Sequence, residues 1–393
     1  MEVIGAPVGR LQGRRAGCEG DFRPVRRFCF VSHPLSLADV VRYEPGAAGK
    51  GAPIVRKILE WMPAYAGVHV TGIATPDGRT TEGWLVMVPL LPEQMLALPR
   101  EDVYRRILAA IDCGVERGAE IAGLGAFTAV IGDGGVTVAE RAPIPVTTGN
   151  SLTIAAGAGA LLRGAEAMGI EPAAATALVV GATGAIGAAC VRLLAPHVRT
   201  ILCAARNATR LRAFVATTAP TVPCELVAVD DLAAGVRAAQ LVLTATSSTS
   251  DVIVPSDLRT GAVVCELSLP HDVARRVALE RPDVLVVEGG NMRVPGAMRL
   301  ERVREPGRPF DLGLPSGTAL ACMAETMVLA LENRLESFTI GRGIALDRVL
   351  EIEAMAARCG FTPAEMRAFD RAIGPDELEA TRAAAARRTA TIT

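Results

Sequence analysis

The sequence predicts an α/β protein built around a doubly wound parallel sheet, with an N-terminal α/β domain before it and a C-terminal helical region after it. Short apolar runs alternate with helical segments between residues 177 and 290, the pattern of a parallel sheet with right-handed crossovers. Half of the 393 residues are hydrophobic and 21% are charged, a composition far from that of disordered chains. The length corresponds to two or three domains.

Five segments follow from these patterns. Residues 1–27, rich in Gly, Arg and Pro without periodicity, are expected to form a flexible leader, and 28–150 the N-terminal α/β domain, with a hairpin at Asp77-Gly78. A small-residue helix over 151–168 opens the parallel-sheet domain, 151–312, whose strands are expected at 177–180, 200–204, 241–244, 263–266 and 284–287. The Pro-, Gly- and Arg-rich stretch 295–315 is predicted to be a loop. Helices at 317–335, 347–359 and 363–373 would form the C-terminal region, 313–375, before a surface tail, 376–393.

Charge and cysteine content exclude several classes of function. The net charge is −1 and aromatic residues are only 4% of the chain, which argues against a nucleic-acid partner. The nine cysteines include no Cys-x-x-Cys pair, so neither a disulfide framework nor a metal site is expected, and reduced thiols favour the cytoplasm. The uncharged stretch 172–191 has the length of a membrane span, but its spaced glycines favour a strand, a turn and a helix instead.

That stretch carries the clearest motif of the chain. Gly181, Gly184 and Gly187 follow a β-branched run and open a helical segment, the context of a Rossmann-type dinucleotide fingerprint. Glycines allow a tight turn and close approach of a pyrophosphate, and the N–H groups of the helix start favour its negative charge. A turn of purely structural use is the alternative. The predicted coenzyme contacts here are Gly181, Thr183, Gly184, Ala185, Ile186 and Gly187.

The end of the next predicted strand indicates which coenzyme is used. Sites that prefer NAD carry Asp or Glu about twenty residues after the glycines, but this chain has Arg206 followed by Asn207. Arg206, helped by Arg210, would pair with a 2′-phosphate, so we expect NADPH, with Asn207 as a further coenzyme contact. The alternative is that Arg206 is an ordinary solvated residue at a helix start.

The sequence lacks the residues that several common reaction mechanisms require. No Tyr-x-x-x-Lys pair, Gly-x-Ser-x-Gly elbow, His-Glu-x-x-His helix or Walker loop occurs in the sequence. The Tyr–Lys mechanism of short-chain dehydrogenases and the common hydrolase and ATPase mechanisms are therefore disfavoured.

Six motifs occur over residues 28–365: Ser32–Leu37, Gly123–Phe127, Val146–Asn150, Gly181–Gly187, Pro315-Ser316 with Ala321–Glu325, and Cys359–Pro363. In their order and spacing they resemble the long-chain acyl-[acyl-carrier-protein] reductases. The resemblance implies formation of a fatty aldehyde from an acyl thioester with NADPH, through an acyl group bound to cysteine. Acyl carrier protein or acyl-coenzyme A would be the thioester donor. The nucleophile falls on Cys322, although the residues alone favour a core thiol at this position.

Other site residues are assigned with alternatives. For ionisation, Cys322 should lie near a helix start or a cation. His33 lies in a matching segment and is the candidate proton donor, or else a histidine satisfied in a loop. Thr148 and Asn150 could bind the nicotinamide or the substrate carbonyl, or cap the following helix. Glu266 stands where the family is richer in glycine and could face the nicotinamide.

Two other functions compete. The first is a shikimate-dehydrogenase-like oxidoreductase acting on a small polar alcohol without covalent catalysis. It would need a Lys–Asp pair in the first domain, and Lys57 has no clear acidic companion in the sequence. The second is a non-catalytic nucleotide-binding protein in which Cys322 only packs in the core.

Overall fold

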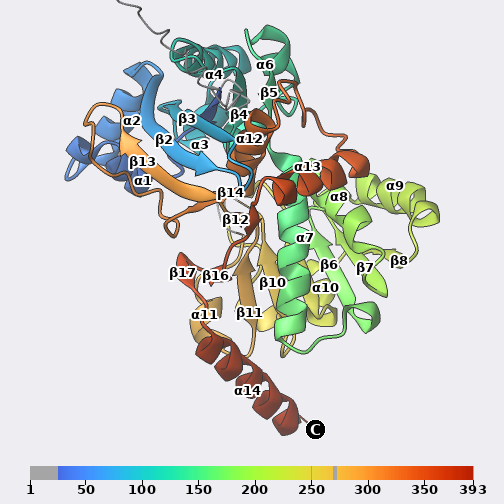
Figure 1. Cartoon of the computed structure of the whole chain (residues 1–393). Helices are drawn as coiled ribbons and strands as arrows, with labels where there is room; N and C mark the ends of the chain where they lie inside the picture. Colours follow the sequence, from blue (N-terminus) through green and yellow to red (C-terminus); the bar gives the residue numbers. More distant parts are fainter. Residues whose placement is uncertain (1–24, 249, 269–271, 393) are drawn as a thin grey trace, which may run out of the picture.

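The computed structural model describes residues 25–248, 250–268 and 272–392, so most of the predicted leader lies outside the described residues. Two six-stranded sheets lie one above the other in the view of Figure 1, and helix α7 (Asn150–Ala167) runs from the first along the second. Within the described ranges, no helix has the length and apolar character needed to cross a membrane.

The first sheet has the strand order β13-β2-β3-β1-β4-β5. Strands β3, β4 and β5 run parallel to β1, whereas β2 is antiparallel and forms the predicted hairpin with β3. Because parallel strands end at the same edge, the segments that follow β1, β4 and β5 lie along one edge of this sheet. The bounds are β1 Arg26–Ser32, β2 Tyr65–Ala74, β3 Thr80–Met87, β4 Ile121–Leu124 and β5 Val146–Thr147.

Strand β13 (Gly296–Arg302) corrects the predicted loop over 295–315. It pairs antiparallel with β2 and places this late segment of the chain at the edge of the first sheet. Met298 and Leu300 pack on the apolar core in alternation with more exposed residues, the period of a half-buried strand. Because Pro, Gly and Arg residues surround this short alternation, the sequence pattern indicated a loop and not a strand.

The second sheet is parallel throughout, with the order β11-β10-β9-β6-β7-β8. The order reverses between β6 and β9, as in Rossmann-type sheets, and ligands bind such sheets at that crevice. The predicted doubly wound parallel sheet is confirmed, although the prediction omitted the short edge strand β8. The bounds are β6 Thr176–Val180, β7 Thr200–Ala204, β8 Glu225–Ala228, β9 Leu241–Thr244, β10 Val263–Glu266 and β11 Leu285–Glu288.

The C-terminal region is only partly helical. Helices α12 (Ala321–Leu331) and α13 (Leu346–Arg358) occur where expected, but the helix predicted over 363–373 is wrong. Phe369 and Asp370 have positive φ angles of 52° and 67°, so the chain turns back on itself there. The result is a small hairpin of β16 (Arg367–Ala368) and β17 (Arg371–Ala372), followed by helix α14 (Pro375–Ile392).

The remaining helices flank the sheets. Helix α8 (Ala185–Leu194) follows β6, and α9 (Ala208–Thr218) follows β7. The others are α1 Leu37–Tyr43, α2 Ala52–Trp61, α3 Pro92–Ala97, α4 Arg100–Val115, α5 Phe127–Val130, α6 Val136–Arg141, α10 Leu232–Ala238 and α11 Val277–Glu280.

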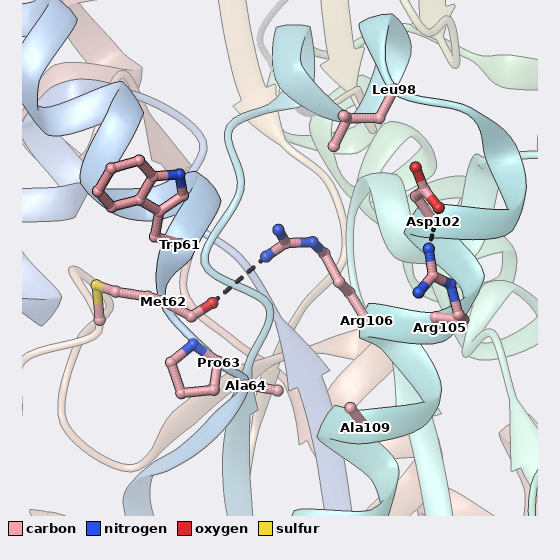
Figure 2. Close-up of a pocket in the computed structure, with 9 residues that line it drawn as sticks. All are labelled: Trp61, Met62, Pro63, Ala64, Leu98, Asp102, Arg105, Arg106 and Ala109. Carbon is pink, nitrogen blue, oxygen red and sulfur yellow. Dashed lines mark hydrogen bonds and ion pairs between the residues drawn. The ribbon is translucent and has the colours of Figure 1, made fainter.

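A surface pocket of about 420 Å³ lies between the end of α2 and helix α4 (Figure 2). Arg106 donates a hydrogen bond across it to the carbonyl oxygen of Met62, at 3.3 Å. Its lining contains none of the site residues predicted from the sequence, so the pocket takes no part in the site described below.

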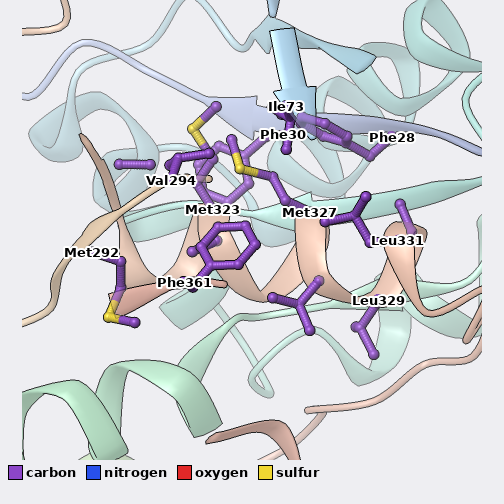
Figure 3. Close-up of a cluster of buried hydrophobic side chains, with 14 of the residues drawn as sticks. Phe28, Phe30, Ile73, Met292, Val294, Met323, Met327, Leu329, Leu331 and Phe361 are labelled. Carbon is purple, nitrogen blue, oxygen red and sulfur yellow. The ribbon is translucent and has the colours of Figure 1, made fainter. Parts of the chain in front are cut away.

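The core of the first sheet is closed by α12. This helix is apolar almost all round, the character of a fully buried helix, and every residue from Met323 to Leu331 is buried. Figure 3 shows Met323 and Met327 beside Phe30 and Ile73 of the sheet. Strands β12 (Asn291–Arg293) and β14 (Thr318–Leu320) pair just before α12 and fix where it begins.

Candidate active site

The glycine turn after β6 requires glycine for steric reasons. Gly181 has φ of 86°, and a Cβ atom there would lie 2.4 Å from the carbonyl oxygen of Ala245. A Cβ atom on Gly187 would lie 2.2 Å from the carbonyl oxygen of Gly181, so α8 packs directly on the turn. Backbone from β6, β9 and α8 therefore meets here without intervening side chains.

This turn also presents hydrogen-bond donors. Helix α8 begins at Ala185 with Gly184 as its N-cap, and the first N–H groups of a helix have no acceptor within the helix. The N–H groups of Ala185 and Ile186 and the positive end of the helix dipole suit an anionic group. Close backbone approach and free donors together fit the pyrophosphate of a dinucleotide.

Arg206 follows β7, the neighbour of β6, and is exposed. Within the described residues it makes no hydrogen bond or ion pair, so its guanidinium is free to bind a phosphate. Arg210 extends toward the same turn, with Nη2 3.4 Å from the carbonyl oxygen of Thr183. The side chain of Asn207 caps α9 by accepting the N–H of Arg210 at 2.9 Å, which leaves its predicted coenzyme contact a prediction.

Cys322 is the second residue of α12 and lies where the two sheets meet. The N–H of the preceding Ala321 donates to the carbonyl oxygen of Gly290, after β11 of the second sheet, at 2.7 Å. On the other side, a Cβ atom on Gly149 would lie 2.3 Å from the Cα of Cys322. Gly149 follows β5 of the first sheet, between Thr148 and Asn150, so the structure brings this predicted segment against Cys322.

The Cys322 thiol is neutral in this structure. Burial raises its pKa to about 12, and the carboxyl of Glu325 acts in the same direction, while the N–H groups of Met323 and Cys322 oppose the shift. The sulfur lies in the first turn of a helix, as predicted, but the stabilisation of a thiolate by the helix start is smaller than the cost of desolvating that thiolate. A thiol with this pKa needs a change in its surroundings, or a base, before it attacks.

His33 follows β1 and is 2% exposed. Its Nε2 accepts the N–H of Phe127 at 3.1 Å, and its Nδ1 is 3.0 Å from the carbonyl oxygen of Pro34, so Nδ1 carries the proton. Burial lowers the pKa of His33 to about 4. The ring is therefore neutral at pH 7 and holds the turn at Ala126, where φ is 47°. Proton donation by His33 stays a prediction.

Thr148 is buried, and its hydroxyl already makes a hydrogen bond within the protein. The Thr148 hydroxyl donates to the carbonyl oxygen of Thr339 at 3.0 Å. Its predicted contact with nicotinamide or substrate, and that of Asn150, stay predictions.

The expected place of Glu266 near the nicotinamide stays a prediction. This residue is buried, and its carboxylate accepts the N–H groups of Asp272 and of Val273, the latter at 2.8 Å. Glu266 thus holds the segment that begins at Asp272.

Glu325 is a functional candidate to which sequence reasoning gave no role. Its side chain is fully buried and accepts hydrogen bonds from Thr147, Thr339 and Leu152. Burial raises its pKa despite these donors. A carboxylate three residues after a cysteine in an otherwise apolar helix was the available signal.

The chain is similar to one known protein family and to several known proteins. The family model described as Shikimate / quinate 5-dehydrogenase matches residues 165–288. The aminotransferase PigE of Serratia sp. (strain ATCC 39006) is 33% identical over 342 residues, which cover 85% of this chain but 39% of that protein. The chain therefore spans about two fifths of the length of that relative.

The long-chain acyl-[acyl-carrier-protein] reductase of Synechococcus elongatus is 26% identical over 311 residues, covering 74% of this chain and 85% of that protein. Among solved structures, quinate dehydrogenase from Corynebacterium glutamicum in complex with NAD is 13% identical. The match has a TM-score of 0.36 and covers 84% of this chain and 99% of that one.

The Rossmann-type second sheet and the family match over 165–288 support an oxidoreductase with a pyridine nucleotide coenzyme. Within the described residues, no group of three or more His, Cys, Asp or Glu side chains could hold a metal ion.

Proposed function

We propose that the chain is an NADPH-dependent reductase that converts an acyl thioester into an aldehyde through an acyl group carried on Cys322. One observation carries the proposal: Cys322 begins a helix at the junction of the two sheets. The loop after β5 contacts Cys322 itself, and the turn after β11 bonds the residue before it. The likeness to the acyl-[acyl-carrier-protein] reductase over 311 residues supports this reading.

The covalent step belongs to the chain's own sulfur. The Cys322 sulfur attacks the carbonyl carbon of the donor thioester, a new C–S bond forms, and the C–S bond to the donor breaks. The donor leaves as a thiol with the proton that Cys322 gives up. When bound, the coenzyme supplies the hydride that reduces the enzyme thioester. With one proton taken up, the C–S bond to Cys322 then breaks, which releases the aldehyde and restores the thiol.

The start of α12 contributes the electrostatics of this step. The N–H groups of its first turn have no acceptor within the helix, and they are the donors that a thiolate or a carbonyl oxygen next to Cys322 requires. The pKa of about 12 must fall before the thiol attacks, and entry of the acyl donor changes the surroundings of the half-buried Cys322.

The coenzyme would be held by the turn Gly181–Gly187, with its 2′-phosphate on Arg206. Gly181 and Gly187 have no room for a side chain, and Arg206 is exposed without a protein partner in the described residues. Since this arginine replaces the acidic residue of NAD sites, NADPH is the proposed coenzyme. The acyl donor is acyl carrier protein or coenzyme A.

The shikimate-dehydrogenase-like alternative gains no support from the first sheet. Lys57 lies on α2 and pairs at 3.1 Å with Glu60, one turn further along the same helix, and the side chain is 62% exposed. It is therefore not the buried member of a Lys–Asp pair. A non-catalytic protein would make no use of Cys322, and the next experiment tests that possibility.

Incubation with a radiolabelled acyl thioester, followed by gel analysis without reductant, tests the proposal. The chain should retain label, and Cys322→Ala should lose it. Cys113→Ala is the matched control, because Cys113 is also half-buried but lies on α4. Addition of NADPH should discharge the label as aldehyde. Unlabelled wild-type protein, or equal labelling of Cys322→Ala, would refute the covalent route.

A further inference from the structure

Glu325 is a fully buried carboxylate that the steps above do not use. It lies one helical turn after Cys322 on α12 and makes no ion pair among the described residues. Burying an unpaired carboxylate is costly unless hydrogen bonds replace the lost water. Here three donors do so: the hydroxyls of Thr147 and Thr339, the latter at 2.8 Å, and the N–H of Leu152 at 2.9 Å.

These donors come from three different segments: the end of β5, the loop after α12, and the first turn of α7. The segments are also bonded to one another. The N–H of Thr339 donates to the Thr147 hydroxyl at 3.1 Å, and the N–H of Thr148 donates to the carbonyl oxygen of Thr339 at 2.9 Å. Glu325 is the point at which this buried network joins α12.

The network ends at Cys322. Gly149 lies between Thr148 and the start of α7, and a Cβ atom on it would be 2.5 Å from the Cβ of Cys322. A negative group is also favourable at the start of α7, because the helix dipole is positive there and the Leu152 N–H has no helical acceptor. Glu325 thus fixes both ends of the Thr147–Leu152 segment that contacts Cys322.

We propose that Glu325 is a positioning residue, which holds the Thr147–Leu152 segment against Cys322 and so sets where the sulfur lies for acyl transfer. The inference rests on the proposed function of Cys322. The role depends on hydrogen bonds and shape, and a neutral side chain that makes the same bonds can fill it.

Two substitutions separate placement from charge. In Glu325→Gln, the amide oxygen can accept the Leu152 N–H, and the amide N–H groups can donate to the two threonine hydroxyls. Glu325→Ala removes this acceptor from all three donors, and of these the Thr339 hydroxyl can still donate to the Ser151 hydroxyl oxygen, at 2.8 Å. We expect kcat for aldehyde formation to fall about 100-fold in the alanine variant, the effect of a displacement of about 1 Å at a reacting group. The glutamine variant should stay within about threefold of wild type.

The Michaelis constant for NADPH should not change in either variant, because the Gly181–Gly187 turn makes no hydrogen bond to this network in the described residues. General destabilisation would reduce the amount of folded enzyme, and hence the apparent kcat, without raising this constant, so kcat is calculated per folded enzyme from the unfolding curve of each variant. A fall in kcat alone, restored by glutamine, indicates placement.

A second readout does not depend on the acyl reaction. Iodoacetamide alkylation of Cys322, followed by peptide mass spectrometry, reports access to the sulfur. In Glu325→Ala the loosened segment should admit water, so alkylation should accelerate at least fivefold while kcat falls. Cys29 and Cys265, both 0% exposed, are internal controls. They should stay protected unless the whole chain has loosened.

The outcomes are distinct. A large fall in kcat and faster alkylation in Glu325→Ala, with near wild-type values in Glu325→Gln, support the inference. Wild-type behaviour of both variants overturns it, and so does an equal loss in both folded variants, which would assign the effect to charge. If Glu325→Ala does not fold, Thr147→Val replaces it, with the same expected directions and smaller changes. If wild type forms no aldehyde, the proposed function fails, whereas the alkylation results still test the placement of the segment.

Discussion

Gly149→Ala gives the sharpest test of the contact between the loop after β5 and helix α12. Its added Cβ would lie 2.3 Å from the Cα of Cys322, 2.4 Å from the carbonyl oxygen and 2.5 Å from the Cβ. Ordinary contact begins at 3.4 Å, so the loop and α12 must separate by about 1.1 Å, the difference between 3.4 and 2.3 Å. A shift of about 1 Å at a reacting group lowers the rate about 100-fold.

Backbone strain is a separate effect and has its own control. Gly149 has φ of 71°, a left-handed conformation that costs an alanine about 1–2 kcal/mol. Gly169, at the other end of α7, has φ of 69° but nothing within 4 Å of its added Cβ. Gly169→Ala should therefore lose similar stability and keep its activity.

Steady-state aldehyde formation, with thermal unfolding of both variants, is the assay. We expect kcat about 100-fold below wild type in Gly149→Ala, with the Michaelis constant for NADPH within about threefold, and near wild-type kcat in Gly169→Ala. Activity of Gly149→Ala within threefold of wild type would show that the Gly149–Cys322 contact does not determine the position of the sulfur.

Three further predictions concern the coenzyme and two titrating groups. Arg206→Ala should raise the Michaelis constant for NADPH at least tenfold and leave that for NADH unchanged. The control is Arg212→Ala, which removes an exposed ion pair between Arg212 of α9 and Asp230; unchanged selectivity in Arg206→Ala would defeat the phosphate assignment. The pKa of His33 is lowered from 6.5 to about 4, so the unfolded chain binds the proton more readily, and the free energy of unfolding decreases as pH falls from about 6.5 toward 4. Between pH 7.5 and pH 5, urea unfolding should show a decrease about 2 kcal/mol larger in wild type than in His33→Gln. Equal decreases would contradict the assigned burial. Because the pKa of Cys322 is raised to about 12, its alkylation without substrate should be slow at pH 7 and still rising at pH 10; a plateau below pH 8 would show a thiolate already stabilised in the resting protein.

The glycine turn of the candidate coenzyme site was predictable from the sequence. The glycine turn needs only a strand, a positive φ angle and a helix start, and these lie within Thr176–Leu194. The position of Arg206 follows from the next strand, which is parallel and adjacent. The alternation of apolar runs likewise predicted the parallel sheet, because the periodicity of a strand or a helix depends only on residues that are close together in the sequence.

The tertiary structure alone decided what surrounds Cys322. Gly149 and Gly290 are far from Cys322 in sequence, and each meets α12 only because both sheets end at its first turn. The neutral thiol, the neutral ring of His33 and the buried Glu325 depend on how much water the packing removes, which no local pattern encodes. The sequence by itself determined the Rossmann-type turn and the choice of candidate nucleophile; packing between distant segments determined the environment in which that nucleophile must react.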